Sequence, residues 1–328
     1  MIKSVRLFEL ESKFKRHHGW AGADGVFSIA YNNDVFWYFS DTFIGDSSED
    51  DQRLNFELIN NSLAISNMDL SEFKFIYNEN PIASIFIPQN GYLWLQDYIL
   101  INDDLYISAL NMENDIFSNE IFKITGLSFV KLKMPFTKKV EYQIIPLKYY
   151  KENIIIGTSI IKENEYFYLF GYRNDFQNKK LILARTLDLL NDEVEYLQED
   201  GSWKNDVDRL KILKENFSSE FKVCKFDNKY YIAYTKHSLG KEIYLLQIED
   251  LFNPYTKEIL VYECVEHQGS IIAYNSKIQE GISNGEEIII SYNVNTLINE
   301  EHSSLDIYRP RFIKLRKEDI DNEFKKIK

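Results

Sequence analysis

Residues 22–43 read GADGVFSIAYNNDVFWYFSDTF, and this stretch has the form of a β-hairpin. Two apolar, aromatic runs, VFSIAY and VFWYF, flank the polar turn sequence NND. Asparagine and aspartate suit tight hairpin turns, and aromatic and β-branched residues favour strands. Asp24 precedes the first strand and Asp41 follows the second. The stretch therefore predicts two paired strands with an acid at each end.

The same plan occurs five times along the chain. A polar turn followed by an apolar, aromatic strand recurs at intervals of about 60 to 70 residues, with one short apolar run before it and another after it. These runs supply about four strands per repeat, and four-stranded repeats around an axis make a β-propeller. The five segments are NNDVFWYFSD from Asn32, INDDLYISAL from Ile101, KENEYFYLFG from Lys162, FDNKYYIAYT from Phe226 and SNGEEIIISYN from Ser283.

We therefore predict an all-β protein, a single five-bladed β-propeller over residues 1–328 with an axial pocket. The opening segment SVRLFELE has no hairpin partner of its own, so we expect it to add a closing strand to the last blade. Helical periodicity predicts a short C-terminal helix in KEDIDNEFKKIK and a second helix in DVDRLKILKENF. A two-sheet β-sandwich is the alternative arrangement of the same strands.

Composition narrows the class of partner. The net charge is -13 and the pI is about 5.0, so nucleic acids and anionic membranes are disfavoured as partners and a neutral ligand is favoured. The first 20 residues carry charges throughout and lack an apolar core, so we expect no secretory signal and a cytoplasmic location for the chain as given. Cys224 and Cys264 are the only cysteines, and we expect both to be buried.

Several motifs with known chemistry are absent from the sequence. GADG is not part of a phosphate-binding loop, and no GxSxG, HExxH or CxxC pattern occurs. The histidines are scattered, and the neighbours His17 and His18 would point apart in a strand. We predict no metal site and no cofactor; a calcium ion on the axis stays open, although no local loop specifies one.

Acids at strand ends are the remaining candidates for chemistry. The first hairpin should bring Asp24 and Asp41 to the same end of a blade, where Trp20, Trp37 and Tyr38 offer faces on which a sugar can stack. Turn formation and strand capping explain the same two aspartates without any function. Glycoside cleavage needs two carboxyl groups, one protonated and one ionised, and burial raises the pKa of the protonated one.

Further polar and aromatic residues stand at comparable places in the later repeats. In the YRPRF motif, Arg309 and Arg311 flank Pro310 and face the same way, either to orient a pocket carboxylate or to form salt bridges between blades. Each candidate alone is also explained as a solvated turn residue or an internal hydrogen bond. The candidates for binding a polyhydroxylated ligand are Trp20, Trp37, Trp94, Gln96, Asp97, Arg173, Tyr234, Asn293, Asn295, Arg309 and Arg311, with Glu220 as a further acid.

Six separated motifs, in order, resemble the bacterial five-bladed propellers classed as domains of unknown function 4185 and 5005. They are GADGVFSI with FWYFSDTFIG, NNSLAI, LARTLDLL with DGSW, SSEFKV, IISYNVN and IYRPRF. Some members of that group are glycoside hydrolases, including endo-acting D-arabinanases, and many are exported. The resemblance implies catalytic carboxyls at Asp24 and Asp41, and it assigns Glu220 to an acidic position ahead of the fourth blade. Gln279, in SKIQEGI, replaces a histidine that could bind substrate or help position an acid, and Gln279 is itself a candidate substrate-binding residue.

The sequence thus predicts a glycoside hydrolase that acts on an oligo- or polysaccharide containing furanose units, or on another bacterial glycan. Asp24 and Asp41 would be the acid and its partner, with Glu220 as a third candidate. Two alternatives stay open. One is a propeller that binds a glycan or a protein without catalysis, and the other is a lyase or transferase step on a sugar.

Overall fold

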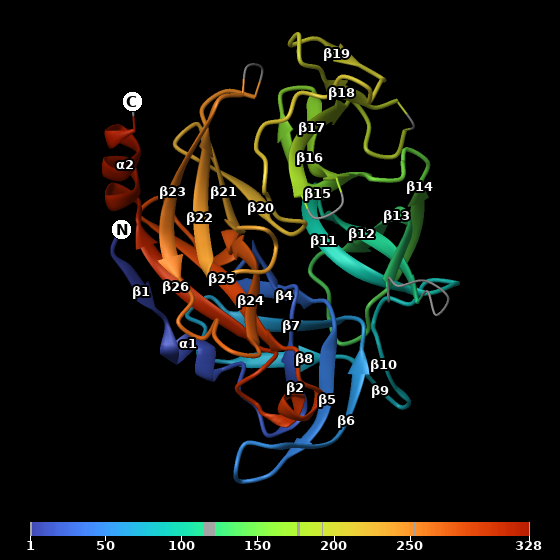
Figure 1. Ribbon diagram of the computed structural model, residues 1–328. Helices are drawn as coiled ribbons and strands as arrows, with labels where there is room; N and C mark the ends of the chain where they lie inside the picture. The colour runs from blue at the N-terminus through green and yellow to red at the C-terminus, as the bar shows by residue number, and fades with distance from the viewer. Residues whose placement is uncertain (1, 115–121, 176–177, 192, 252–253, 328) are drawn as a thin grey trace. The chain divides into compact units, whose positions relative to one another are not determined.

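The protein is described here by a computed structural model covering residues 2–114, 122–175, 178–191, 193–251 and 254–327 (Figure 1). Strands make up nearly all of its regular structure, and helix α2 (Lys317–Lys326) lies at the C-terminal end. Acidic residues in the first turn of α2 and lysines in the last turn interact favourably with the helix dipole and stabilise the helix. Its residues Ile320 and Phe324 are buried. The predictions of an all-β protein and of a C-terminal helix are confirmed. The described helices are too short and too polar to span a bilayer.

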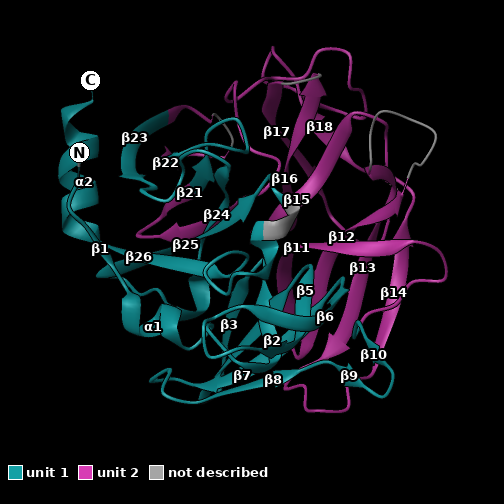
Figure 2. Ribbon diagram, turned by 60° about the horizontal axis from the view of Figure 1, so that its bottom comes forward, with its two compact units in different colours: residues 1–85, 233–245, 257–328 teal, residues 86–232, 246–256 magenta. Residues whose placement is uncertain are grey.

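The chain divides into two compact units (Figure 2). Unit 1 contains Met1–Ile85, Ala233–Leu245 and Lys257–Lys328, and unit 2 contains Phe86–Ile232 and Leu246–Thr256. A separate cluster of buried apolar side chains lies within each unit.

Unit 1 contains the first and last strands of the chain. One sheet has the order β3-β4-β7-β8, a second β2-β5-β6, a third β1-β26-β25-β24, and β9 pairs with β10. The strands are β1 (Ser4–Arg6), β2 (His18–Ala23), β3 (Phe27–Tyr31), β4 (Asp34–Phe39), β5 (Thr42–Ser47), β6 (Arg53–Ile59), β7 (Ser62–Asn67), β8 (Phe73–Ile76), β9 (Asn78–Glu79), β10 (Ile82–Ala83), β24 (Ile271–Ile278), β25 (Glu287–Thr296) and β26 (Pro310–Arg316).

Unit 2 contains a sheet of order β11-β12-β13-β14 and another of order β15-β16-β17-β18-β19, and a further sheet in the chain runs β20-β21-β22-β23. The described residues thus hold five separate sheets of four or five strands, which rules out a two-sheet sandwich. The strands are β11 (Tyr92–Ile101), β12 (Asp104–Asn114), β13 (Phe122–Lys133), β14 (Tyr142–Leu147), β15 (Ile154–Glu163), β16 (Tyr166–Asp175), β17 (Asn178–Thr186), β18 (Glu195–Leu197), β19 (Trp203–Lys204), β20 (Lys222–Phe226), β21 (Lys229–Thr235), β22 (Glu242–Ile248) and β23 (Thr256–Glu263).

Asparagines form the tips of the repeated hairpins. Asn32, Asn102, Asn164 and Asn228 lie in four of the five predicted turns, and all have positive φ angles, between 54° and 59°. Asparagine enters this left-handed region more readily than most residues, so each polar turn sequence reverses the chain where the pattern predicts. In the fifth turn, the side chain of Asn284 instead accepts hydrogen bonds from two backbone amides.

A β-bulge recurs in the first strand of three repeats. The register shifts between Leu95 and Tyr98 in β11, between Ile156 and Ser159 in β15, and between Tyr274 and Lys277 in β24. A bulge bends a strand and redirects its side chains, so these strands share a local irregularity as well as their apolar pattern.

The N-terminal segment closes the sheet of β24, β25 and β26, as the sequence predicts. Strand β1 pairs antiparallel with β26, with Val5 opposite Lys314 (Figure 1). The predicted strand is shorter than expected, because Phe8–Ser12 form helix α1. Arg6 holds this segment with two hydrogen bonds to Glu11, at 2.5 and 2.9 Å. Short 3₁₀ turns, η1 (Glu280–Ile282) and η2 (Asn299–Ser303), lie before and after β25.

The second predicted helix, in DVDRLKILKENF, is wrong. Residues 206–217 form turns, bends and isolated bridges, in which Leu210 pairs with Gln198 and Lys214 with Leu181. Leu210 and Phe217 are buried against strands, so tertiary packing overrides the local helical periodicity. Both cysteines are buried and free, as expected.

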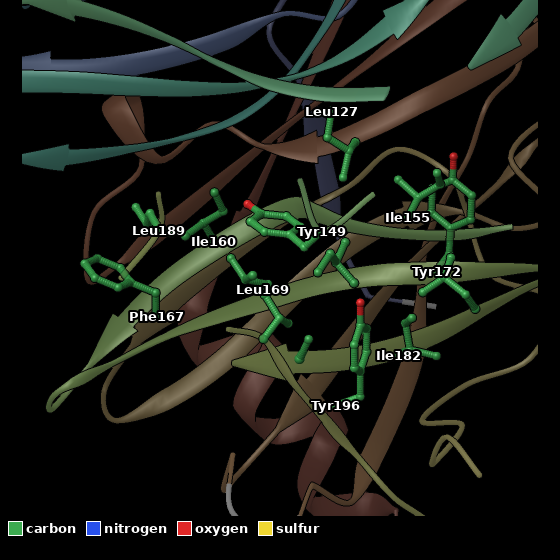
Figure 3. Close-up of a cluster of buried hydrophobic side chains, with 14 of the residues drawn as sticks. Leu127, Tyr149, Ile155, Ile160, Phe167, Leu169, Tyr172, Ile182, Leu189 and Tyr196 are labelled. Atoms are coloured by element: carbon green, nitrogen blue, oxygen red, sulfur yellow. The ribbon is translucent and has the colours of Figure 1, made fainter. Parts of the chain in front are cut away.

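Aromatic rings fill the core of unit 1. Phe14 is fully buried, and its ring centroid lies 5.4 Å from Phe312, 5.7 Å from Trp37 and 6.0 Å from Trp20. In unit 2, Tyr149, Ile160, Leu169 and Tyr196 belong to one apolar cluster (Figure 3). Each unit therefore buries its own apolar side chains.

Replacing Phe14 by alanine should lower the free energy of unfolding by about 3–5 kcal/mol, because the cavity cannot be refilled by the surrounding rings. Phe8→Ala is the matched control. Phe8 is 68% exposed, so its loss should change stability by less than about 1 kcal/mol. Denaturant unfolding followed by tryptophan fluorescence measures both. Equal effects would contradict this description of the core.

Candidate active site

The first hairpin brings the backbones of Asp24 and Asp41 together. Asp24 lies between β2 and β3, and Asp41 lies between β4 and β5. The Asp24 amide donates to the Asp41 carbonyl at 3.1 Å, and the Ser40 amide donates to the Asp24 carbonyl at 3.0 Å. Both acids are partly exposed. The two ends of the hairpin therefore meet, as the sequence predicts.

Two tyrosines donate to one oxygen of Asp24. The hydroxyl of Tyr274 lies 2.8 Å from Oδ2 and that of Tyr308 lies 3.1 Å from the same atom. Burial raises the pKa of the Asp24 carboxyl above its ordinary value, against the hydrogen bond from Tyr274, the charge of Lys277 and the hydrogen bond from Tyr308, which lower it. Asp24 therefore stays protonated at a higher pH than an exposed aspartate.

The positive charge of Lys277 lowers the pKa of the Asp24 carboxyl. Lys277 is buried, donates to Oδ1 of Asn275, and its Nζ atom lies 4.5 Å from the centroid of the Phe27 ring. The bulge between Tyr274 and Lys277 lets both side chains act on Asp24, although residues three apart in a regular strand face opposite ways. The Nδ2 atom of Asn275 meets no partner among the described residues.

Unfavourable backbone conformations gather around Asp24. Tyr308 and Asn275 both have φ of 60°. This conformation is accessible to asparagine but rare for a bulky aromatic residue such as Tyr308. Gly22 has φ of 140°, and a Cβ atom there would lie 2.4 Å from the carbonyl oxygen of Tyr308. Backbone strain of this kind persists only where surrounding contacts impose it, and it is concentrated at functional sites.

Two buried amides fasten the chain on either side of Asp24. The Nδ2 atom of Asn293 donates to the carbonyl of Ala23 at 3.0 Å, and Nε2 of Gln279 donates to the carbonyl of Val26 at 2.9 Å. Neither side chain is exposed, and Gln279 also donates to Ser291 at 2.7 Å. Asn293 and Gln279, predicted as substrate-binding residues, thus have the geometry of positioning residues for Asp24.

Several other predicted residues of unit 1 lie in its interior. Trp20 and Trp37 belong to the aromatic core and donate to Ser62 and Ser66, so they offer no open stacking face. Tyr234 is buried and donates to Glu258. Asn295 is partly exposed, and its side-chain Oδ1 accepts from the Thr296 amide at 2.8 Å.

The two arginines of YRPRF form ion pairs away from Asp24. Arg309 donates to Asp306 at 2.9 Å and to the carbonyl of Leu305 at 3.0 Å. Arg311 is buried, and its Nε atom lies 3.7 Å from Glu266 and 3.9 Å from Glu11. Of the two roles left open by the sequence, this geometry matches salt bridges.

In unit 2, Asp97 forms a closed ion pair. Its carboxylate is fully buried and contacts Lys222 at 2.5 Å, Ser159 at 2.5 Å and the Ile160 amide at 3.0 Å. Gln96 is buried beside it in the bulge of β11. Arg173 makes two hydrogen bonds of 2.9 Å to Asp175. These contacts leave Asp97 no exposed surface, in contrast to Asp24.

Trp94 and Glu220 remain partly exposed in unit 2. The amide of Glu220 donates to Ser218 at 3.2 Å. Burial, and then the charge of Glu220, raise the pKa of the Tyr172 phenol. Trp94 lines a groove in the same unit.

Sequence reasoning missed Tyr274, Asn275 and Lys277, and it quoted Tyr308 only as part of the YRPRF motif. Nothing in a single sequence marks a tyrosine within a strand as a partner for a distant acid. The one available signal was local: AYNSK interrupts an apolar strand with an asparagine and a lysine, which is typical of a bulge.

The pH dependence of stability tests the environment of Asp24. A carboxyl whose pKa is raised by folding binds protons more tightly in the folded state, so its contribution to stability is lost as the pH rises from its ordinary pKa of 3.8 through its folded pKa. Relative to wild type, Asp24→Asn should therefore gain free energy of unfolding as the pH rises above the ordinary pKa of 3.8 through the raised folded pKa.

Denaturant titrations at each pH measure this difference. Asp34→Asn, at an exposed position at the start of β4, is the control and should show no comparable trend. A pH-independent offset between Asp24→Asn and wild type would contradict the raised pKa.

The fold is similar to that of several solved structures. A candidate hydrolase from Bacteroides ovatus aligns with a TM-score of 0.81 at 18% identity, covering 95% of this chain and 89% of that one. A β-1,2-mannobiose phosphorylase from Listeria innocua aligns with a TM-score of 0.57 at 14% identity, covering 99% of both chains. A family 43 β-xylosidase/α-arabinofuranosidase from a compost metagenome, bound to xylotriose, aligns with a TM-score of 0.52 at 14% identity, covering 92% of both.

These similarities show a fold shared with glycoside-processing enzymes. No curated protein matches the chain. The model of one family matches residues 9–318, nearly the whole sequence. The chain belongs to the family named domain of unknown function 5005.

Proposed function

We propose that the chain is a single five-bladed β-propeller that acts as a glycoside hydrolase. Support for five blades comes from the five sheets of four or five strands and from β1, which completes the last of them. Support for the reaction class comes from the fold shared with a glycosidase and a sugar phosphorylase. The family resemblance adds the expectation of an axial pocket.

The hydrogen-bonded environment of Asp24 is the observation that carries the proposal. The residue is partly exposed, and its carboxyl accepts two phenol hydrogen bonds and has a pKa raised by burial. A carboxyl whose pKa is raised keeps its proton to a higher pH and can donate it to the leaving oxygen of a glycosidic bond. Asp24 is therefore the proposed acid.

Asp41 is the proposed partner of Asp24, because the hairpin joins their backbones. The Nδ2 atom of Asn60 donates to Oδ1 of Asp41 at 3.2 Å, which stabilises the ionised form that a nucleophile or a base for water requires. Glu220 is the third proposed carboxyl. The proposed substrate is a neutral glycan, furanose-containing or otherwise bacterial, since a chain with a net charge of -13 disfavours polyanions.

Hydrolysis assays on a panel of neutral oligosaccharides test this function. Asp24→Asn and Asp41→Asn should each lower kcat by about 10²–10⁴-fold, because each removes one proton-transfer or nucleophilic group. Glu220→Gln should also lower it. Asp34→Asn is the matched control: Asp34 is exposed at the start of β4 and has no proposed catalytic role, so this variant should retain wild-type turnover.

Equal turnover in wild type and both aspartate variants would remove these residues from the mechanism. Saturable binding of an oligosaccharide by wild type without turnover would favour the non-catalytic alternative.

Phosphorolysis is a second candidate reaction, favoured by the similarity to the mannobiose phosphorylase over 99% of both chains. In that reaction, phosphate takes the place of water as the attacking group. Assays with and without inorganic phosphate separate the two reactions, since phosphorolysis yields a sugar phosphate and hydrolysis yields a free reducing sugar.

A further inference from the structure

Unit 2 contains a groove of about 780 Å³ whose lining residues all belong to that unit. Ligand sites commonly have volumes of about 300–1,000 Å³ and combine apolar walls with a few placed polar groups. The walls come from the first residues of β11 and β15, from β13 and from the end of β16. The proposed acids Asp24 and Asp41 do not line this groove.

Four aromatic rings form the apolar wall. Trp94 is half-buried, and its ring centroid lies 5.1 Å from that of Phe122. The hydroxyl of Tyr150 donates to the carbonyl of Ile124 at 3.0 Å. Tyr172 pairs with Ile155 across β15 and β16, and the two side chains lie together at the edge of the core cluster (Figure 3). Tyr172 is buried, whereas Trp94 and Tyr150 are partly exposed, so a ligand can stack on these two held rings with little loss of side-chain entropy.

Polar groups stand beside the rings. Lys179 donates to Oδ1 of Asn174 at 2.6 Å, and its Nζ atom lies 5.7 Å from the centroid of the Tyr172 ring. Glu152 lines the same groove, so charges of both signs face it. Flat rings next to amides and mixed charges match a ligand with apolar faces and hydroxyl edges and without net charge.

The groove leads to the third proposed acid. Ser219 is one of its lining residues, and Glu220 follows directly in the chain.

We propose that this groove binds a neutral oligosaccharide of about two or three sugar rings, with one ring on Trp94 and the chain directed toward Glu220. The inference rests on the proposed function, because that function supplies the role of Glu220. It adds an extended binding region within unit 2, built on Trp94, Tyr150 and Tyr172.

Calorimetric titration of the full chain with xylotriose, β-1,2-mannobiose and linear arabinotriose tests the proposal. Thr125 is exposed and lines the groove, and its hydroxyl donates to the carbonyl of Asn111, so Thr125→Trp should fill the groove without disturbing the core. Thr137→Trp is the matched control, because Thr137 is exposed, lies outside the lining residues and also donates to a backbone carbonyl.

Wild type should bind at least one probe, and Thr125→Trp should weaken that binding about tenfold or more, while Thr137→Trp leaves it unchanged. Trp94→Ala should weaken it similarly, in contrast to Trp203→Ala, a half-buried tryptophan of unit 2 outside the groove. Equal affinities for Thr125→Trp and Thr137→Trp, or no binding of any probe by wild type, would overturn the proposal.

Turnover assays on the same proteins keep the two proposals apart. Binding that depends on the groove, with no cleavage by wild type, would reject the hydrolase and keep the groove. Cleavage by wild type with equal KM in Thr125→Trp and Thr137→Trp would reject the groove and keep the hydrolase.

Discussion

The hydrogen bonds that Tyr274 and Tyr308 donate to a single oxygen of Asp24 are the contacts on which the candidate site depends. They join residues 250 and 284 positions apart in the chain. To make them, Tyr308 adopts a left-handed backbone against Gly22, where no side chain fits, and β24 bulges after Tyr274. The amides of Asn293 and Gln279 then hold the chain on either side of the acid. A locally unfavourable backbone is thus maintained by contacts from several strands.

Two aspartates of this protein show how environment decides the use of a carboxyl group. Asp97 sits in the bulge of β11 with a lysine, a serine and a backbone amide around it, and no part of it reaches the surface. Asp24 also lies near a lysine, but its direct donors are phenols and part of its surface is open. Removing one partner of a buried ion pair leaves an uncompensated charge, so the Asp97 pair serves structure. A carboxyl without an ion-pair partner in direct contact and with a raised pKa can instead exchange a proton with a ligand.

Local patterns in the sequence predict most of the strands. Polar turns between apolar runs mark hairpins because asparagine accepts the required backbone, and the tips at Asn32, Asn102 and Asn164 agree. The pairing of β1 with β26 also follows, since an unpaired opening strand needs a partner. The predicted helix after Trp203 failed because packing against strands outweighs helical periodicity there.

The candidate site is less predictable, because its contacts are long-range. The pairing of Asp24 with Asp41 follows from a hairpin, which is local. The burial of Trp20 and Trp37 could not be predicted in this way, because an aromatic residue beside an acid can either pack in a core or stack on a ligand. The roles of Tyr274, Lys277 and Gln279 depend on contacts between strands that are far apart in sequence. Composition and spacing do not predict such long-range contacts.

Carbon-13 NMR titration of the aspartate carboxyl groups, with Asp24 assigned by the Asp24→Asn variant, tests the central claim most directly. The structure predicts that Asp24 titrates above the ordinary value of 3.8, and that Lys277→Met raises its pKa further by removing a nearby positive charge. An Asp24 pKa at or below 3.8, or one that Lys277→Met leaves unchanged, would contradict the account of this carboxyl as a buried acid held ready to donate a proton.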